Sequence, residues 1–263
     1  MIRSALMNVM TAAAIKAGRG LKRDFGEVEN LQVSVKGPGD FVSAADRRAE
    51  KTLFEELSRA RPGYGFLMEE GGEIEGADKS HRWIVDPLDG TTNFLHGLPI
   101  FAINIALERE GLIVAGLTYN PISDEMYVAE KGQGAWVNNR RLRVSARRSI
   151  ADGLIACGVP PLGRAPLHPH FKSELAAVMA HAGGVRRLGA AALDLALVAA
   201  GRFDAFWERG LHPWDMAAGM LLVREAGGYL SDADGGDAIF KSGSICAGNE
   251  AIHRHLLQLL RAA

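Results

Sequence analysis

Two aspartates, three positions apart, are the residues of this chain best suited to chemistry. They are Asp86 and Asp89, in the segment WIVDPLDGTTNF of residues 83–94. Two carboxylates this close repel each other unless a cation lies between them. Aspartate oxygens on a rigid turn suit a hard cation such as Mg²⁺, which often completes its coordination with a substrate phosphate. The spacing therefore indicates metal-dependent phosphate chemistry.

The residues that follow could bind the phosphate. Gly90, Thr91 and Thr92 open a predicted helix, and backbone N–H groups at a helix start attract anions. Carboxylates for a metal beside amides for a phosphate form an arrangement that phosphoryl transfer needs. The structural alternative is a turn shaped by Asp86 and Asp89, with a threonine as the helix cap, because Asp, Pro and Gly are common in turns.

Three further acidic residues lie where they could join this aspartate pair. Asp215 lies near the start of a long apolar helix, in LHPWDMAAG, where Pro213 fits the first turn. Glu69 and Glu70 precede a glycine-rich segment at residues 71–78. Each could instead be an ordinary helix-dipole or loop charge. If these carboxylates join the aspartate pair, a phosphate ester would be repelled strongly without cations, so we expect the chemistry to require metal.

These residues need elements that position them. Residues 1–18 predict an amphipathic helix, and residues 43–60 predict a second one with a capping-box-like start at Ser43 and Asp46. A short buried strand at residues 82–85 leads to the aspartate pair. Three more strands, separated by polar connections, predict an antiparallel meander. They span residues 101–107, 112–119 and 125–130.

The second half of the chain alternates strands with helices, which predicts an α/β layered region. The predicted strands span residues 153–159, 202–208 and 244–249. The predicted helices span residues 170–183, 190–201, 213–228 and 251–263. Because no low-complexity linker or internal repeat divides the chain, we expect a single domain over residues 1–263 with an internal boundary near residues 140–150.

Composition excludes several classes of protein. Of the 263 residues, 48% are apolar and 23% are charged, as in folded proteins without extended disorder. A formal net charge of −1 gives no overall attraction to nucleic acid or anionic membranes. Cys157 and Cys246 stand far apart, so no disulfide scaffold is expected. Without a signal-peptide core or an apolar run of about 18–20 residues, we predict a cytoplasmic protein with no membrane span.

Taken in order, these segments resemble the inositol monophosphatase family, within the Mg²⁺-dependent, lithium-sensitive phosphatase superfamily. WIVDPLDGTTNF and LHPWDMAAGMLLVREAGG are similar to its two signature segments. Four other similar segments are KGPGDFVSAAD (36–46), MEEGGEIEGAD (68–78), GAAALDLALVAAGRFDAFWERG (189–210) and SICAGN (244–249). The resemblance covers nearly the whole chain and is greatest to the bacterial inositol-1-monophosphatase branch. It implies a layered αβαβα sandwich.

The resemblance also implies a set of metal ligands. Glu69, Asp86 and the Leu88 carbonyl would hold one Mg²⁺ ion. Asp86, Asp89 and Asp215 would hold a second, so that Asp86 bridges the two. A third, weaker ion would be held chiefly by Glu69 and water. The expected cofactor is therefore two or three Mg²⁺ ions.

Catalytic roles follow from the same resemblance. Thr91 pairs with Asp46 to position the water that attacks phosphorus, and Glu69 is the third residue implied in catalysis. The amides of Gly90 and Thr91 would cradle the phosphate. The effects that this arrangement supplies are generation of the nucleophile and charge stabilisation by two metals.

Contacts to the rest of the substrate are implied at four positions. They are Arg186, Ala191, Glu208 and Asp215. The structural alternatives are a surface cation for Arg186, a packing alanine for Ala191 and a strand-end charge for Glu208, since polar loop residues often have no role.

The expected function is hydrolysis of a small polyol phosphate, most of all inositol-1-phosphate, by a homodimer that uses Mg²⁺ and is sensitive to lithium. Other phosphomonoesters remain as alternatives: histidinol phosphate, a nucleotide 2′- or 3′-phosphate, or a sugar bisphosphate. A different class of function is regulatory binding of RNA or a nucleoprotein. It would use the five arginines of NNRRLRVSARR, residues 138–148, although a solvated hairpin is the favoured interpretation of that segment.

Overall fold

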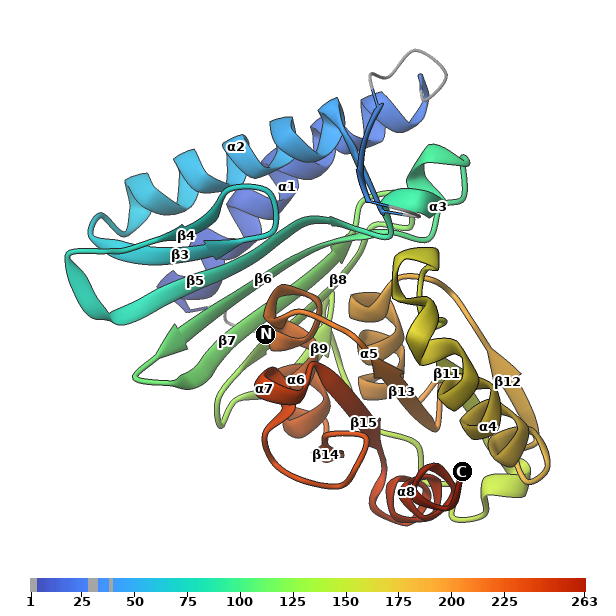
Figure 1. The fold of residues 1–263 in the computed structure, drawn as a ribbon. Coiled ribbons are helices and arrows are strands. Elements are labelled where there is room, and N and C mark those ends of the chain that lie inside the picture. Colours follow the sequence, from blue (N-terminus) through green and yellow to red (C-terminus); the bar gives the residue numbers. More distant parts are fainter. Residues whose placement is uncertain (1–3, 28–32, 38–39) are drawn as a thin grey trace.

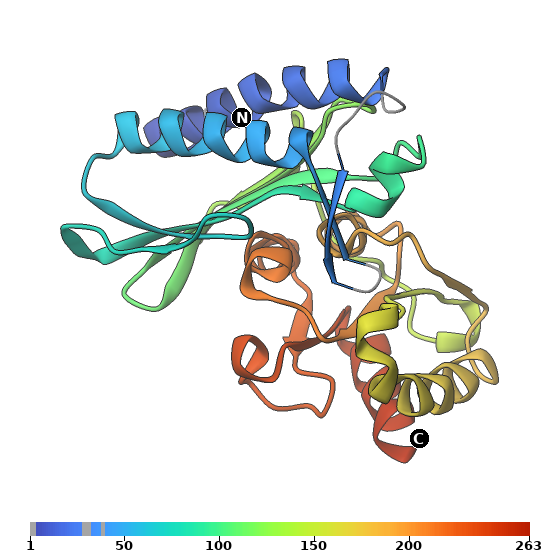
Figure 2. The same ribbon diagram turned by 45° about the horizontal axis from the view of Figure 1, so that its top comes forward.

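The structure is a computed structural model that describes residues 4–27, 33–37 and 40–263. Its elements form five layers, in the order helices, sheet, helices, sheet, helices (Figures 1 and 2). This order confirms the expected αβαβα sandwich. Residues 1–3 of the first predicted helix and residues 38–39 of the segment KGPGDFVSAAD lie outside the described residues.

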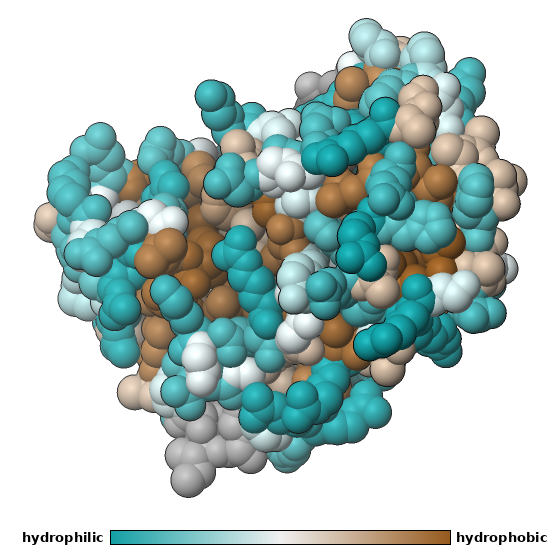
Figure 3. Space-filling model, turned by 90° about the horizontal axis from the view of Figure 1, so that it is seen from below, coloured by the Kyte–Doolittle hydropathy of each residue, from teal (hydrophilic) through white to brown (hydrophobic). Residues whose placement is uncertain are grey.

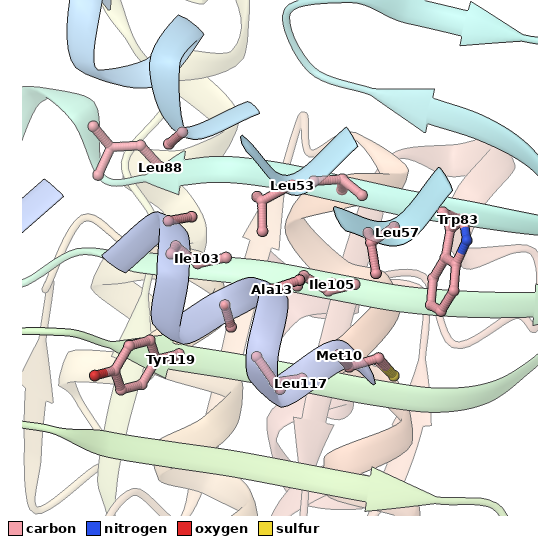
Figure 4. Close-up of a cluster of buried hydrophobic side chains, with 14 of the residues drawn as sticks. Met10, Ala13, Leu53, Leu57, Trp83, Leu88, Ile103, Ile105, Leu117 and Tyr119 are labelled. Carbon is pink, nitrogen blue, oxygen red and sulfur yellow. The ribbon is translucent and has the colours of Figure 1, made fainter. Parts of the chain in front are cut away.

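Two long helices, α1 (Ala5–Phe25) and α2 (Ala44–Ala60), form the first layer. Ser4 caps α1, and Ser43 caps α2 in a capping box with Asp46, as predicted. Both helices bury one face against the first sheet (Figure 4). The buried side chains labelled there include Met10, Ala13, Leu53 and Leu57 from the helices and Ile103, Ile105 and Leu117 from the sheet. Burying a large apolar side chain contributes roughly 1.5–3 kcal/mol.

The second layer is an eight-stranded sheet. Its strands are β3 (Tyr64–Met68), β4 (Gly72–Ile74), β5 (Asp78–Asp89), β6 (Ala102–Arg109), β7 (Leu112–Asn120), β8 (Glu125–Glu130), β9 (Gly134–Val137) and β10 (Arg140–Arg141). The order across the sheet is β10-β9-β8-β7-β6-β5-β3-β4. From β5 to β10 each strand is antiparallel to the next, which confirms the meander, whereas β3 is parallel to β5. A separate antiparallel pair, β1 (Val33–Gly37) and β2 (Asp40–Ser43), precedes α2.

Two predictions for this sheet need correction: one strand is longer than predicted, and another was not predicted. The strand predicted at residues 82–85 continues to Asp89. Pro87 ends the apolar pattern but not the strand, because the register with β6 shifts between Asp86 and Asp89 and such a bulge tolerates a residue without an N–H. The segment 71–78, expected to be a connection, contains β4, whose side chains are all exposed and therefore give no apolar signal.

The third layer lies between the sheets and consists mainly of α5 (Ala191–Ala199) and α6 (Pro213–Glu225). These helices are buried on nearly all sides, so their sequences are broadly apolar rather than amphipathic. They pack closely, since a Cβ on Gly219 of α6 would lie 2.5 Å from a side-chain atom of Leu195 on α5. Two short helices are α3 (Thr91–Leu95) and α7 (Ile239–Ser242).

The fourth layer is a five-stranded sheet. Its strands are β11 (Leu154–Cys157), β12 (Gly184–Arg186), β13 (Ala205–Arg209), β14 (Tyr229–Ser231) and β15 (Ser244–Gly248). The order is β12-β11-β13-β15-β14, with β11 parallel to both neighbours and β15 antiparallel to both of its own. The three predicted strands are confirmed. The edge strands β12 and β14 were not predicted, because three residues are too few to show a period-two pattern.

Helices α4 (His168–Met179) and α8 (Glu250–Ala262) cover the outer face of this sheet (Figure 2). The helix predicted at residues 170–183 ends earlier, because the chain must turn into β12. Two 3₁₀ turns, η2 (Ile150–Asp152) and η3 (Leu162–Leu167), precede β11 and α4.

Residues 142–149 connect β10 to η2 without a helix or strand. All five arginines between residues 138 and 148 are exposed. Only Arg140 and Arg141 belong to a hairpin, with β9, so the hairpin prediction holds for these two and is wrong for the remainder. The chain leaves the first sheet there because Leu142 and Val144 pack against the helices of the third layer. The internal boundary near 140–150 stays a prediction.

The surface is mixed in character. Figure 3 shows a face on which hydrophilic residues are interspersed with smaller hydrophobic areas. Leu112, Leu162 and Met179 are among the large apolar side chains exposed, and they belong to different elements, so singly they need no partner. The described residues include no helix that is both long enough and apolar enough to cross a membrane.

Candidate metal and phosphate site

Four helices begin around the end of β5, and each contributes a side chain or a cap to one site. Asp46 is in the first turn of α2, and Thr91 is the first residue of α3. Asp89 accepts the N–H of Ala192 at the start of α5, and Asp215 is in the first turn of α6. Helix starts favour negatively charged groups. The convergence of these starts therefore makes an acidic cluster tolerable in the fold.

The predicted aspartate pair occupies the bulge of β5. Asp86 is 1% exposed, and its Oδ1 accepts the N–H of Leu88 at 2.9 Å. Asp89 is partly exposed, and its Oδ2 accepts the N–H of Ala192 at 2.7 Å. In each carboxylate, one oxygen is thus held by a backbone N–H. The other oxygen takes no part in that hydrogen bond.

An asparagine that sequence reasoning missed joins Asp86 to the helix that carries Asp215. Asn104 is the cross-strand partner of Asp86, and its Nδ2 donates to the carbonyl of Trp214 at 2.5 Å. The hydroxyl of Thr118 donates to Asn104 at 2.7 Å and orients the amide. Asp215 itself accepts the N–H of His212 at 2.7 Å. A polar residue inside the apolar run FAINIAL was the available signal.

Glu69 follows β3 directly and reaches the same cluster. Its N–H donates to the carbonyl of Val85 at 3.2 Å, so the parallel pairing of β3 with β5 sets its position. Its carboxyl is hydrogen-bonded to that of Asp86. The structure therefore brings together all four carboxylates that the sequence proposed as metal ligands.

Burial and mutual repulsion raise the pKa values of this cluster. For Asp86, burial is the largest cause, followed by the charges of Glu69 and Asp89, and its pKa lies well above the ordinary value. Burial and the charge of Glu69 raise the pKa of Asp89 to about 7, against the N–H of Ala192. Burial and the charge of Asp89 likewise raise the pKa of Asp215. A nearby cation would relieve each of these effects.

The donor chemistry fits a hard divalent cation, although the side chains do not stand as a finished cage. Among the described residues, no group of three or more His, Cys, Asp or Glu side chains could hold a metal as it stands. Asp86, Asp89 and Asp215 each give one oxygen to a backbone N–H instead. Carboxylate and carbonyl oxygens without sulfur or imidazole suit Mg²⁺. Because a carboxylate oxygen that accepts one N–H keeps further acceptor capacity, these hydrogen bonds are compatible with metal binding.

The predicted catalytic pair is in hydrogen-bond contact. The hydroxyl of Thr91 lies 3.0 Å from Oδ1 of Asp46 and 3.0 Å from the carbonyl of Leu88. Asp46 is fully buried, and its other oxygen accepts the N–H and the hydroxyl of Ser43. Burial is the main cause of its raised pKa. A hydroxyl has one proton to donate, so Thr91 can serve only one of its two acceptors at a time.

The turn at Gly90 admits no other residue without strain. Its φ of 91° lies in the left-handed region, and a Cβ there would meet the carbonyl oxygen of Ile100 at 2.9 Å. Asn93, one turn later, donates to the carbonyls of Ile100 and Leu188 at 2.8 and 2.9 Å. These bonds join the start of α3 to the segment before α5 and so fix the backbone around Gly90.

The other residues predicted to contact the substrate do not all lie at the acidic cluster. Glu208 lies at the end of β13, and its carboxyl occupies the space that a Cβ on Gly158 would need. Burial, followed by the charges of Asp194 and Asp215, raises its pKa well above the ordinary value. Ala191, 6% exposed, begins α5 beside Asp89. Glu208 and Ala191 therefore adjoin the acidic cluster.

No described contact joins Arg186 to the acidic cluster. Arg186 donates to the carbonyl of Val185 at 2.9 Å and lies over Gly184. The next residue, Arg187, is the one whose charge acts on Glu208 and on Asp194. Sequence reasoning missed Arg187 and Asp194, because an arginine pair and an aspartate inside an apolar helix give no distinct pattern.

Known proteins match this chain over nearly its full length. The model of the inositol monophosphatase family matches residues 3–263. A protein of Mesorhizobium japonicum named inositol-1-monophosphatase is 65% identical over 261 residues, which cover 99% of this chain and 98% of that protein. A protein of Escherichia coli K12 named Nus factor SuhB is 40% identical over 256 residues, covering 97% and 96%.

Solved structures agree with the sequence matches. The crystal structure of the extragenic suppressor protein suhB from Bartonella henselae has a TM-score of 0.96 and 61% sequence identity, covering 98% of this chain and 99% of that one. Because the family match, the relatives and the fold all extend over the whole chain, the chain belongs to the inositol monophosphatase family, whose members are generally Mg²⁺-dependent phosphatases.

Proposed function

We propose that this protein is a Mg²⁺-dependent phosphomonoesterase that hydrolyses a small polyol phosphate, with inositol-1-phosphate as the preferred substrate. The observation that carries the proposal is the gathering of Glu69, Asp86, Asp89 and Asp215 beside the Thr91–Asp46 pair. Relatives named inositol-1-monophosphatase, such as that of Mesorhizobium japonicum, support the choice of substrate.

The proposed metal ligands are the four carboxylates and the Leu88 carbonyl, for two or three Mg²⁺ ions. Bound Mg²⁺ would offset the negative charge of the phosphate and make the attacking water more acidic. The chain's own part is to hold the carboxylates in place through backbone N–H groups and to exclude bulk water from Asp86, which is 1% exposed.

Thr91, Asp46 and Glu69 are the proposed catalytic residues. The Thr91 hydroxyl can accept a hydrogen bond from the attacking water while it donates to Oδ1 of Asp46, and this orients the water. Asp46 is held by Ser43, so the pair is fixed before substrate arrives. The N–H groups of Gly90 and Thr91 would bind the phosphate. Glu208, Ala191 and Asp215 would contact the leaving alcohol, and Arg186 is proposed as a fourth, outer contact.

The proposal is tested by phosphate release from a panel of monoesters, with and without Mg²⁺. The panel contains inositol-1-phosphate, histidinol phosphate, a 3′-phosphoadenosine nucleotide and fructose-1,6-bisphosphate. We expect Mg²⁺-dependent turnover that falls roughly 10²–10³-fold in Asp89→Asn. The exposed Asp237→Asn is the matched control and should keep full activity. Absence of turnover on every ester by folded protein would overturn the proposal, and another preferred ester would replace the substrate.

A second candidate function is RNA or nucleoprotein binding. It is favoured by the exposed arginines between residues 140 and 148 and by relatives named Nus factor SuhB. Salt-dependent RNA binding that persists in Asp86→Asn would support this function, and its absence at low salt would remove it.

We also propose a homodimer and a cytoplasmic location. Sedimentation of the purified protein should give twice the mass of one chain, and the monomer mass would contradict the dimer. Fractionation of cells that produce the protein should recover it with the cytoplasm.

A further inference from the structure

One buried carboxyl near the acidic cluster has no hydrogen-bond partner in the described part of the chain. Asp194, in the first turn of α5, is 1% exposed, and neither of its oxygens has a hydrogen-bond partner among the described residues. Buried polar groups in native proteins are nearly always paired, because leaving a buried carboxyl unpaired is costly. An exception of this kind calls for a functional reason.

The fold pairs another carboxyl that is equally buried. Asp204 is also 1% exposed, yet it accepts hydrogen bonds from the hydroxyl of Ser145, from Arg147 at 3.2 Å and from the N–H of Leu154 at 2.7 Å. Burial alone therefore does not explain the isolation of Asp194.

The position of Asp194 connects it to a proposed metal ligand. The N–H of Ala192, two residues earlier on the same helix turn, donates to Asp89 at 2.7 Å. The titratable groups whose charges act between Asp194 and its surroundings are Asp89, Glu208, Arg187 and the Cys157 thiol. Arg187 is the only cation among them, and it is exposed, with its guanidinium against Gly189. Burial, followed by the charge of Asp89, raises the pKa of Asp194 well above its ordinary value, and the charge of Arg187 offsets this only in part.

We propose that Asp194 is a positioning residue for the metal site, which strengthens the hold of Asp89 on a divalent cation and lowers the stability of the metal-free protein. The inference rests on the proposed function. Groups just behind metal ligands commonly tune metal affinity, and a buried charge without a partner destabilises a fold until something compensates it.

This role does not depend on the protonation state of Asp194 before the cation binds. An ionised carboxyl attracts the cation through space. A protonated one can release its proton when the cation arrives, and this release adds to the binding free energy. An asparagine of the same shape does neither, so Asp194→Asn isolates the carboxyl from its packing.

The test measures Mg²⁺ affinity and metal-free stability separately. Calorimetric titration with Mg²⁺ alone should show binding about tenfold weaker in Asp194→Asn than in the wild type. Thermal unfolding in a chelator should show a melting temperature about 2–4 °C higher. The variant should therefore bind Mg²⁺ more weakly and yet unfold at a higher temperature without metal. A merely structural role would give only a lower melting temperature. Asp194→Ala, which also lacks the carboxyl, should show the same loss of affinity.

Asp204→Asn is the matched control. It removes a paired carboxyl of equal burial, so its melting temperature should fall while its Mg²⁺ affinity stays within about twofold of the wild type. Wild-type binding of Mg²⁺ with unchanged affinity in both Asp194 variants would overturn this inference alone. A wild type that binds no Mg²⁺ would overturn the metal-dependent function and this inference with it.

Discussion

Two of the regions that bury carboxylates, those around Glu174 and Asp86, surround them with opposite kinds of charge. Glu174 on α4 has a side chain 1% exposed, and it accepts hydrogen bonds from Arg209 at 2.8 Å and from Trp207 at 3.3 Å, with His170 at 3.2 Å. Asp86 in β5 is equally buried, but the charges that act on it most are those of other acidic residues.

The charges around these two carboxylates indicate a structural role for Glu174 and a functional role for Asp86. Around Glu174 the chain supplies the opposite charge, so the group is compensated as soon as the protein folds. Around Asp86 the charges that act most are those of Glu69, Asp89 and Asp215, so among the described residues the group is less compensated than Glu174, and a bound cation would supply the missing opposite charge. Sites that perform chemistry commonly give up stability in this way. The comparison predicts that the two regions respond differently to mutation, to metal and to pH.

The largest expected effect is on the paired region. Arg209→Met removes the charged partner of Glu174 and leaves a buried carboxyl uncompensated. We expect a loss of about 3 kcal/mol in the free energy of unfolding, measured by chemical denaturation in a chelator and again with Mg²⁺. The loss should be the same in both conditions, because the network lies outside the acidic cluster.

The double variant Arg209→Met with Glu174→Leu is the control for that measurement. Removal of both charges should recover part of the stability. A loss below about 1 kcal/mol in the single variant would mean that the pair behaves as a surface ion pair, and the contrast with Asp86 would then fail.

The proposed catalytic pair, Thr91 and Asp46, should show the reverse response. Thr91→Val keeps the shape of the side chain but removes the hydroxyl that joins Asp46 and the Leu88 carbonyl. We expect kcat for the preferred ester to fall about a hundredfold, with a change in unfolding free energy of about 1 kcal/mol or less. Thr91→Ser should restore most of the rate. Equal rates for the valine variant and the wild type would remove this hydroxyl from the mechanism.

The smallest expected effect is the pH dependence of the metal-free protein. Because the pKa of Asp89 is raised from 3.8 to about 7 in the folded state, folded protein binds more protons than unfolded protein between these values. Its contribution to stability is therefore greatest at low pH and declines as pH rises from about 4 to about 7.

Melting temperatures in a chelator should fall over this pH interval, and Asp89→Asn should make the decline shallower. Saturating Mg²⁺ should largely abolish it. An increase in melting temperature over the same interval in the chelator would contradict the assignment of the raised pKa to the acidic cluster.

Much of the site could be predicted because its signals are local in sequence. Asp86, Asp89, Gly90 and Thr91 lie within six consecutive residues, and Asp215 sits in the first turn of an apolar helix, as predicted. The capping box that holds Asp46 was also readable, because it depends on residues three positions apart. Such features follow from backbone geometry over one helical turn.

Asn104, Arg187 and Asp194 were not predicted, because their neighbours come from other parts of the chain. Asn104 matters because β6 pairs with β5 and packs beneath α6. Arg187 was not singled out, since two adjacent arginines cannot be told apart in the sequence, whereas in the structure the charge of Arg187 acts on Glu208. The substrate contact at Arg186 stays a prediction. The edge strands β12 and β14 were missed for a related reason, since neighbouring strands supply their stability.

The sequence by itself determined the layered class of the fold, the family resemblance and the residues able to bind metal and phosphate. These depend on periodicity and on residue types at short spacing, which are properties of the chain alone. Only the tertiary structure decided which carboxyls face one another, which are paired and which are left without a partner. That distinction requires distances between residues far apart in sequence, because the energy of a buried charge is set by whatever the fold places beside it.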